Sequence, residues 1–319
     1  MIYLKTNDSL KNEEVDQYLE RIINSKLFTN GYIFFGAEGI GKKQKSIRYI
    51  KGIFKEYSSV KNIEERIINN NHPDLLIIEP GNLIKKKNLN HTTSEIPKNR
   101  NQEIIKVDQI RNIKTFLGQK SIESEKKVVL IIDAHLLNEA ASNCLLKTLE
   151  EPSNGIFILI TSKLNLLLST IKSRCQLVRF KSFSSKKIET FLKNSLNTSK
   201  LLSYRNINLQ DLINSANGSP GKILDNINIL NEFPEEIKIL LDSPLKEPLE
   251  ILKFSKLISE KLEIFQQIFL VNFIQQIWWR KTRDRSLVTK LESLKKHIDN
   301  NVQPRLAWEV TLLKIAMED

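Results

Sequence analysis

The feature that most constrains this chain is a glycine-rich loop between a β-prone segment and a helical one. Gly36, Gly39 and Gly41 follow the apolar and aromatic residues 32–35. With the lysine that comes next, they match the phosphate-binding pattern G-x-x-x-x-G-K-[ST] at every position except the last. Glycines let backbone N–H groups face a phosphate, and a following helix adds positive potential at its N-terminus. The sequence therefore predicts a loop that cradles phosphate.

The two lysines after the glycines have different consequences. Lys42 is placed to neutralise the outer phosphates of a nucleotide. Lys43 stands where the pattern has Ser or Thr, whose hydroxyl holds Mg²⁺. We therefore expect weak binding of ATP or ADP at best, with Mg²⁺ present only together with nucleotide.

A second strong stretch begins at Lys127 and continues with five apolar residues, 128–132, that end in Asp133. Because ligands of open α/β sheets sit at the carboxyl ends of the strands, Asp133 is placed to meet Mg²⁺, as a Walker B aspartate does. Many motors of this type have a glutamate next, which activates the attacking water. Here Ala134 can accept no proton, and His135 is expected to be a surface residue that leads a helix.

Two further apolar runs, residues 75–78 and 155–160, predict strands buried on both faces. Thr161 ends the second run, where its hydroxyl could sense a γ-phosphate. His72 precedes the first run in a turn with Asn, Pro and Asp, and no nucleophile is near it in sequence. A structural role is expected for His72. The polar residues 80–102 are expected to form a surface loop.

Composition sets the outer bounds. The chain has 319 residues, of which 40% are hydrophobic and 27% charged, a globular profile with no apolar run of the roughly 20 residues that a membrane helix needs. Its first residues lack the apolar segment of a signal peptide, so a cytoplasmic location is expected. Cys144 and Cys175 are too few for a disulfide framework and are expected to be small core residues. The net charge of +12 fits a protein that works beside nucleic acid, but a genome rich in Lys, Asn and Ile codons explains it equally.

Several motifs together carry a family resemblance. Residues 141–152 read A-S-N-C-L-L-K-T-L-E-E-P, and a Ser-Arg-Cys triplet stands at residues 173–175. With His-Pro-Asp at residues 72–74 and I-K-V-D-Q-I at residues 105–110, this order resembles the AAA+ subunits of bacterial clamp loaders, and among them the delta-prime subunits of DNA polymerase III. The resemblance covers roughly residues 10–225.

This resemblance implies a stator within a heteropentamer of tau/gamma-type motor subunits and a delta subunit, which loads the sliding clamp onto primed DNA. It implies no membrane partner, and contact with DNA through the complex. Arg174 matches the arginine finger that such subunits extend to a neighbour's ATP, where a cation stabilises charge on the γ-phosphate. The alternative for Arg174 is a surface salt bridge.

Departures from the family pattern argue against an ATPase cycle of this chain's own. Residues 217–222 match the start of the lid's sensor helix, but Gly221, followed by Lys222, stands where motor subunits place an arginine. With Lys43 and Ala134, this makes three departures. We expect a component of the DNA polymerase III holoenzyme without independent ATPase activity. Residues 55–71 contain no cysteine, so the zinc module of many relatives is not expected.

The predicted fold is a RecA-like AAA+ α/β domain with a parallel sheet (residues 1–182), a helical lid (183–230) and an all-α collar (231–319). In the collar, apolar residues at helical spacing predict one long continuous stripe, formed by Ile258, Leu262, Phe265, Phe269, Phe273 and Ile277. Beyond it, Trp278 and Trp279 are followed by four basic residues, Arg280, Lys281, Arg283 and Arg285. Stacking on DNA, helix packing and contact between subunits all remain open for them.

Two other functions remain open. The chain could be an active motor ATPase of the clamp loader, which retained Mg²⁺-dependent hydrolysis would support. It could instead be a scaffold or adaptor with a decayed phosphate loop and no arginine finger.

Overall fold

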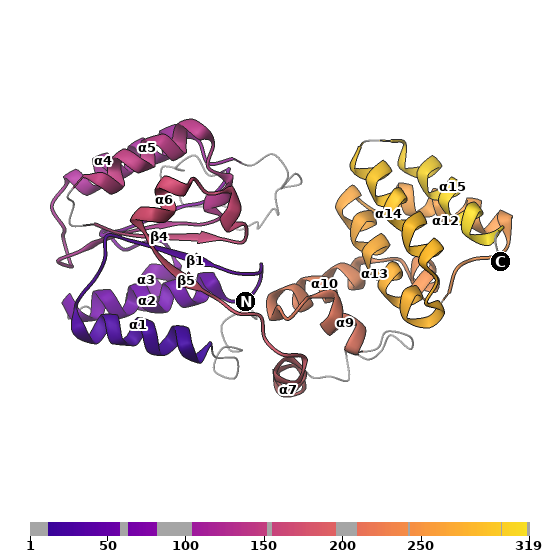
Figure 1. Ribbon diagram of the computed structural model, residues 1–319, viewed down its shortest axis with the longest axis horizontal. Coiled ribbons are helices and arrows are strands. Elements are labelled where there is room, and N and C mark those ends of the chain that lie inside the picture. The colour runs from indigo at the N-terminus through magenta and orange to yellow at the C-terminus, as the bar shows by residue number, and fades with distance from the viewer. Residues whose placement is uncertain are drawn as a thin grey trace. The chain divides into compact units, whose positions relative to one another are not determined.

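The computed structural model describes residues 12–57, 63–81, 104–151, 155–195, 209–241, 243–300 and 302–317. They form two compact units that divide between Ser182 and Phe183 (Figure 1). The first is an α/β sheet unit and the second is entirely helical in its described part, so the predicted fold class is confirmed. Residues 82–103, most of the predicted surface loop, lie outside the described residues.

The first unit is built on five parallel strands in the order β2-β3-β4-β1-β5. The strands are β1 (Gly31–Phe35), β2 (Leu75–Ile78), β3 (Lys127–Ile131), β4 (Gly155–Thr161) and β5 (Gln176–Arg179). Every residue of β3 and β4 is buried. Strands covered on both faces read as unbroken apolar runs, which is why the sequence pattern located them.

Helices cover both faces of the sheet. The helices of this unit are α1 (Glu13–Ser25), α2 (Lys42–Tyr57), α3 (Ile63–Ile68), α4 (Val107–Gly118), α5 (Glu139–Glu150) and α6 (Ser169–Arg174), with 3₁₀ turns η2 (Ala134–Leu136) and η3 (Leu164–Leu166). Figure 1 shows α1, α2 and α3 on one face and α4, α5 and α6 on the other. The apolar stripes of the second group pack with the strands in one buried cluster.

The His-Pro-Asp turn before β2 is a structural joint, as predicted for His72. The His72 ring stacks on Phe54 with 4.1 Å between centroids, and its Nδ1 accepts the Asp74 N–H at 3.2 Å. The Asp74 carboxylate accepts N–H groups of residues 122, 123 and 124 at 2.7–2.9 Å and the Ser124 hydroxyl at 3.2 Å. Asp74 thereby holds the segment that leads into β3 against the segment that leads into β2.

The second unit is an array of helices with one continuous core. Its elements are α7 (Ser185–Ser195), α9 (Leu209–Ser215), α10 (Pro220–Glu232), α11 (Glu235–Lys238), η4 (Ile239–Leu241), α12 (Pro248–Lys261), α13 (Ile264–Thr282), α14 (Arg285–Asp299) and α15 (Pro304–Ala316). A single buried cluster extends from Ile188 in α7 to Ile315 in α15. The predicted division between lid and collar at residue 230 therefore crosses a shared core, and it stays a prediction.

The prediction that the apolar stripe from Ile258 to Ile277 lies on one continuous helix is wrong, because these residues belong to two helices, α12 and α13. The chain leaves α12 at Leu262, and Glu263 begins α13 as its N-cap, with Gln266 returning a hydrogen bond to the Glu263 N–H at 3.0 Å. The E-x-x-Q signal of this capping box was present in the sequence. Phe265, in the first turn of α13, is 52% exposed and does not belong to the core.

We expect Asp74→Asn to destabilise the protein by about 2–3 kcal/mol at neutral pH, because the amide replaces a charged acceptor of several hydrogen bonds. Burial alone would raise the pKa of Asp74, but the backbone N–H groups and Ser124 hydroxyl hold it below its ordinary value. This stabilisation is therefore fully present above about pH 4, the ordinary value of the unfolded chain, and is lost as the pH falls through the lower folded value.

Urea unfolding of the native chain and the variant at several pH values measures this effect. Asp108→Asn, at an exposed carboxylate in the first turn of α4, is the matched control. An equal loss of stability in both variants at neutral pH would contradict the assignment.

Candidate functional site

The parallel sheet brings the predicted nucleotide residues to one edge. The phosphate loop begins at Gly36, directly after β1, while Asp133 follows β3 and Thr161 ends β4. Because β4 lies between β1 and β3, all three positions are at neighbouring carboxyl ends. The charges of Lys42 and Lys43 act on the Asp133 carboxyl, which places these side chains in one electrostatic environment.

The loop has the backbone that its glycines predict. Gly36, Gly39 and Gly41 have φ values of 153°, 71° and 95°, in the region that favours glycine. Gly36 also lies tightly against the end of β5, since a Cβ there would stand 2.4 Å from the Phe180 carbonyl oxygen. The loop then enters α2 at Lys42, so its amides and the helix N-terminus face the same space.

Lys42 is only 6% exposed, and its ammonium is held by the loop itself. Its Nζ donates to the carbonyl oxygens of Gly36 at 2.7 Å and Ala37 at 2.6 Å. A phosphate would have to exchange with these two carbonyls as the partner of Lys42. An ammonium beside a glycine-rich loop that enters a helix N-terminus nevertheless suits phosphate.

Lys43 does not fit the metal position of the pattern. Its Nζ forms an ion pair with Glu79 Oε1 at 2.7 Å, and Glu79 directly follows β2. The Glu79 carbonyl in turn accepts the Gln109 side-chain amide at 3.0 Å, which ties the first turn of α4 to the same strand end. A cation cannot supply the oxygen ligand that Mg²⁺ requires. The residues present thus fit a nucleotide phosphate better than they fit its metal.

The sequence analysis did not identify Glu79 or Gln109. Glu79 had a usable signal, because a carboxylate directly after a buried parallel strand belongs to the ligand-bearing edge of the sheet. Gln109 had none beyond its place in the I-K-V-D-Q-I motif, since a glutamine three residues after Lys106 equally predicts a local helix cap. Gln109 in fact does two things. Its Nε2 donates to the Glu79 carbonyl, and its Oε1 accepts the Lys106 N–H at 2.9 Å, which caps the helix.

Asp133 adopts a left-handed backbone conformation, with φ 51° and ψ 48°. Burial raises the pKa of its carboxyl above the ordinary value, against the lowering influence of His135 and the two loop lysines. Ala134, which follows, is fully buried and offers no proton acceptor. The end of β3 therefore carries one carboxylate, and the side chain after it can accept no proton.

His135 was expected at the surface, and this is wrong. It lies half-buried in η2, with Nδ1 3.3 Å from the Thr161 hydroxyl oxygen. Thr161 is fully buried and also accepts the Lys163 N–H at 3.1 Å. The turn after Asp133 is a short 3₁₀ segment that folds back onto β4, rather than the start of an exposed helix. Burial lowers the pKa of His135, and Asp133 partly opposes this shift.

Arg174 lies at the opposite edge of the sheet. It ends α6, two residues before β5, whose first residue Gln176 pairs with Tyr32 at the start of β1. Gly36 is one strand length further on, a separation of about 16 Å for five residues. The guanidinium is paired with Glu150 Oε1 at 2.5 Å, and Nη1 donates to the Thr170 carbonyl at 3.1 Å. Arg174 remains substantially exposed and cannot serve the loop of its own chain.

Cys175, next to this arginine, is a packing residue. It is buried, and a Cβ on Gly31 would stand 2.6 Å from its Sγ, so the triplet is seated closely against the start of β1. Burial raises the pKa of the Cys175 thiol to about 11, which leaves it protonated and unreactive near neutral pH. Cys144 is only partly buried. In the described part of the chain, no group of three or more His, Cys, Asp or Glu side chains could hold a metal ion.

Gly221 and Lys222 belong to the second unit. Gly221 occupies the first turn of α10, after Ser219 and Pro220, and Ser219 caps this helix by accepting the Lys222 N–H at 3.4 Å. Asn217 and Gly218 precede them in the left-handed region. The predicted start of the sensor helix is therefore the capped N-terminus of α10. Gly221 stands there at the position where the resemblance places an arginine in motor subunits.

Two family models cover most of the chain. One, described as DNA polymerase III, delta subunit, matches residues 11–184. The other, described as cyanobacterial DNA polymerase III delta prime, C-terminal domain, matches residues 187–315. A solved structure of a DNA polymerase III gamma subunit-related protein from Thermotoga maritima superposes with a TM-score of 0.55 at 18% identity, covering 94% of this chain and 98% of that one. At that identity, the likeness concerns the fold.

Individual relatives match over shorter stretches. The chain is 31% identical over 182 residues to DNA polymerase III subunit delta' of Bacillus subtilis, covering 55% of this chain and 49% of that protein. It is 30% identical over 184 residues to subunit tau of the same organism, covering 57% and 30%. With Haemophilus influenzae subunit delta', it shares 47% identity over 77 residues, 24% of each chain. The matched stretches thus span about half or less of each relative.

We expect Asp133→Asn to lower the pKa of His135 further, because the Asp133 charge is the main influence that raises it against burial. An NMR titration of the His135 ring measures the change. Glu38→Gln is the matched control, since Glu38 acts in the same direction more weakly. A rise in the His135 pKa on Asp133→Asn, or a larger fall on Glu38→Gln, would contradict the described arrangement.

Proposed function

Because the chain belongs to the DNA polymerase III delta-prime family of clamp-loader subunits, we propose that it acts as a stator that serves its partners' ATP sites and not its own. The observation that carries this proposal is the position of Arg174, at the sheet edge opposite Gly36. An exposed arginine so placed is available to a neighbouring subunit and not to the phosphate loop of the same chain.

The chain's own nucleotide site is proposed to be degenerate. Lys43 pairs with Glu79 where a metal-binding hydroxyl is expected, and Ala134 stands where a carboxylate would activate water. ATP or ADP would be held weakly by the loop N–H groups and Lys42, with Mg²⁺ supplied only by the nucleotide. Thr161 would approach the γ-phosphate only by leaving its contacts with His135 and Lys163. No independent ATPase activity is expected.

Arg174 is proposed as the finger in trans. Its present partner, Glu150, is half-exposed, so the ion pair is solvent-screened and contributes little to stability. Exchanging Glu150 for a neighbour's γ-phosphate therefore costs little. The same ion pair also suits a purely structural arginine, and this is the observation that favours the scaffold alternative.

The proposed partners are tau/gamma-type motor subunits and a delta subunit in a heteropentamer, with the sliding clamp and primed DNA engaged by the complex in the cytoplasm. Large apolar side chains stand exposed on three helices of the second unit, as an assembly surface requires: Leu249 and Leu252 on α12, Phe265 on α13, and Leu306 and Val310 on α15. No helix in the described part of the chain is long and apolar enough to cross a membrane.

ATP binding by the isolated native chain is expected to be nearly independent of Mg²⁺, because Lys43 offers the metal no ligand. Lys43→Ser should make it Mg²⁺-dependent by supplying a hydroxyl and removing a positive charge from the site. Calorimetric titrations with Mg²⁺ or with a chelator measure this. Lys55→Ser, which removes an exposed lysine from the last turn of α2, is the control. A strong Mg²⁺ requirement in the native chain would point to an active motor site.

Arg174→Ala is expected to reduce ATP turnover by the reconstituted clamp loader at least tenfold, with clamp and primed DNA present. An arginine finger contributes about 10³–10⁵ in rate in GTPases, and several sites share the total turnover here. Arg179→Ala removes another exposed arginine, on β5, and serves as the matched control. Gel filtration verifies that each variant enters the complex.

An unchanged rate in an intact Arg174→Ala complex would leave only the scaffold role. Failure of the native chain to join the motor subunits would overturn the proposed partnership. Arg174→Lys separates charge from geometry: a lysine keeps the charge but lacks the planar fork that contacts two phosphate oxygens. We therefore expect partial activity at most.

A further inference from the structure

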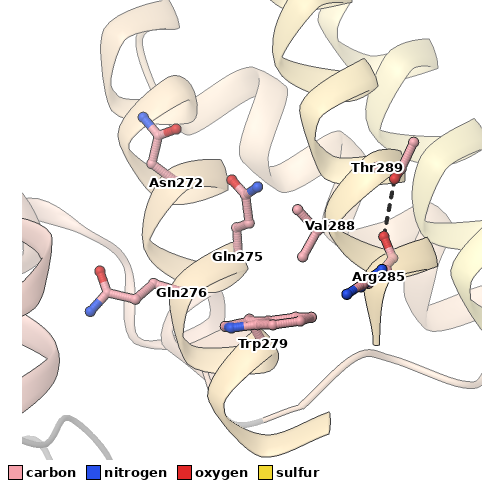
Figure 2. Close-up of a pocket in the computed structure, with 7 residues that line it drawn as sticks. All are labelled: Asn272, Gln275, Gln276, Trp279, Arg285, Val288 and Thr289. Carbon is pink, nitrogen blue, oxygen red and sulfur yellow. Dashed lines mark hydrogen bonds between the residues drawn. The ribbon is translucent and has the colours of Figure 1, made fainter. Parts of the chain in front are cut away.

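The two adjacent tryptophans of α13 have different environments. Trp278 is fully buried, and its Nε1–H donates to the Leu240 carbonyl at 3.0 Å. Trp279 is only partly buried and lines a pocket of about 510 Å³ between α13 and α14. Figure 2 shows its ring lying flat at one end of the pocket, with Gln275 and Val288 above it and Arg285 beside it. Trp278 is thus a packing residue of the core, whereas the Trp279 ring is accessible from the surface.

Most of the other lining residues carry polar groups, although most of the lining surface itself is apolar. One side of α13 contributes three amide side chains, Asn272, Gln275 and Gln276, which both donate and accept hydrogen bonds. Val288 is the one aliphatic side chain among the lining residues. A flat aromatic ring beside several amides suits a planar ligand with hydrogen-bonding edges.

Positive charge gathers at the tryptophan end of the pocket. The Arg283 guanidinium lies 5.7 Å from the centre of the Trp279 ring, and Arg285 lines the rim. Within the described residues, neither arginine has a carboxylate partner. Arg280 differs, because it is paired at 2.8 Å with the buried Asp211 and so belongs to the internal structure. Two exposed arginines beside an aromatic face form the combination that single-stranded nucleic acids recognise.

A carboxylate that contacts a lining residue, Glu292, gives the ligand a direction. Glu292 Oε1 accepts the Gln275 amide at 3.1 Å, further along the α13–α14 groove than Trp279. A phosphate near Glu292 would be repelled, so the phosphates belong at the end with Arg283 and Arg285.

We propose that this pocket binds single-stranded DNA directly, with one base stacked on Trp279 and the adjacent phosphates on Arg283 and Arg285. The side-chain Oε1 atoms of Gln275 and Gln276 meet the edge of the stacked base, because their Nε2 groups already donate to Glu292 and to the Asp211 carbonyl. Stacking on an aromatic ring tolerates every base, so little sequence preference is expected. The proposal does not depend on the arginine finger, since it concerns a different unit and needs no ATP.

Fluorescence anisotropy with a dye-labelled oligothymidine and the full chain, without nucleotide, tests the proposal. Trp279→Ala is expected to weaken binding on the order of tenfold, as the loss of one stacked base predicts, and Trp279→Phe less. Phe265→Ala, which removes another exposed aromatic side chain of α13, should leave binding unchanged.

The charges are tested by salt dependence. Arg283→Gln with Arg285→Gln should weaken binding and reduce the slope of log affinity against log salt by about 1.4, as expected for two lost phosphate contacts. Lys246→Gln with Lys253→Gln removes the same charge at other exposed positions and should leave the slope nearly unchanged.

Three results would overturn the proposal. One is equal binding by native and Trp279→Ala proteins that share the same far-ultraviolet circular dichroism. Another is an equal change of slope in the two double variants, which would indicate only diffuse attraction to the basic chain. The third is tighter binding of a poly-glutamate peptide than of oligothymidine, which would assign the pocket to an acidic protein segment.

Discussion

Parallel pairing of five buried strands is the constraint on which the first unit depends. Since all strands point the same way, every strand ends at one edge and every connection returns to the other. The glycine loop, Glu79, Asp133 and Thr161 are therefore neighbours although they lie far apart in sequence. The same rule sends Arg174, which precedes a strand, to the far edge. The phosphate-type loop and Arg174 therefore lie at opposite edges of one sheet.

The loop edge keeps the backbone shape of the phosphate-loop pattern while one of its side chains departs from that pattern. The glycine conformations, the helix N-terminus and the buried Lys42 remain. What differs is the set of oxygen ligands, because Lys43 brings a second cation that recruits Glu79. The Lys43–Glu79 ion pair links the start of α2, directly after the loop, to the end of β2.

Most of the fold could be predicted from the sequence, and the failures have physical causes. Buried parallel strands are continuous apolar runs, so β1 to β4 were found directly. The phosphate loop was found because few sequences place glycines so regularly before a lysine. His135 was misplaced because burial of a short 3₁₀ turn depends on its packing against β4, which no local pattern encodes. The break at Leu262 was missed because helical spacing continues across it, although the capping signal at Glu263 and Gln266 was readable. The Lys43–Glu79 pair joins the first turn of α2 to the residue after β2, and it is visible only once the strand order is known.

The shared core of the second unit has a mechanical meaning. Side chains of α7, α9 and α10 are part of the same buried cluster as those of α13, α14 and α15, and Gln276 and Arg280 of α13 both bind Asp211 of α9. Separating the first three helices from the rest would expose apolar surface and leave the buried Asp211 carboxylate without its arginine partner. The described helices from α7 to α15 are thus held together by one core, so moving the first three helices away from the rest would cost the burial that this core provides.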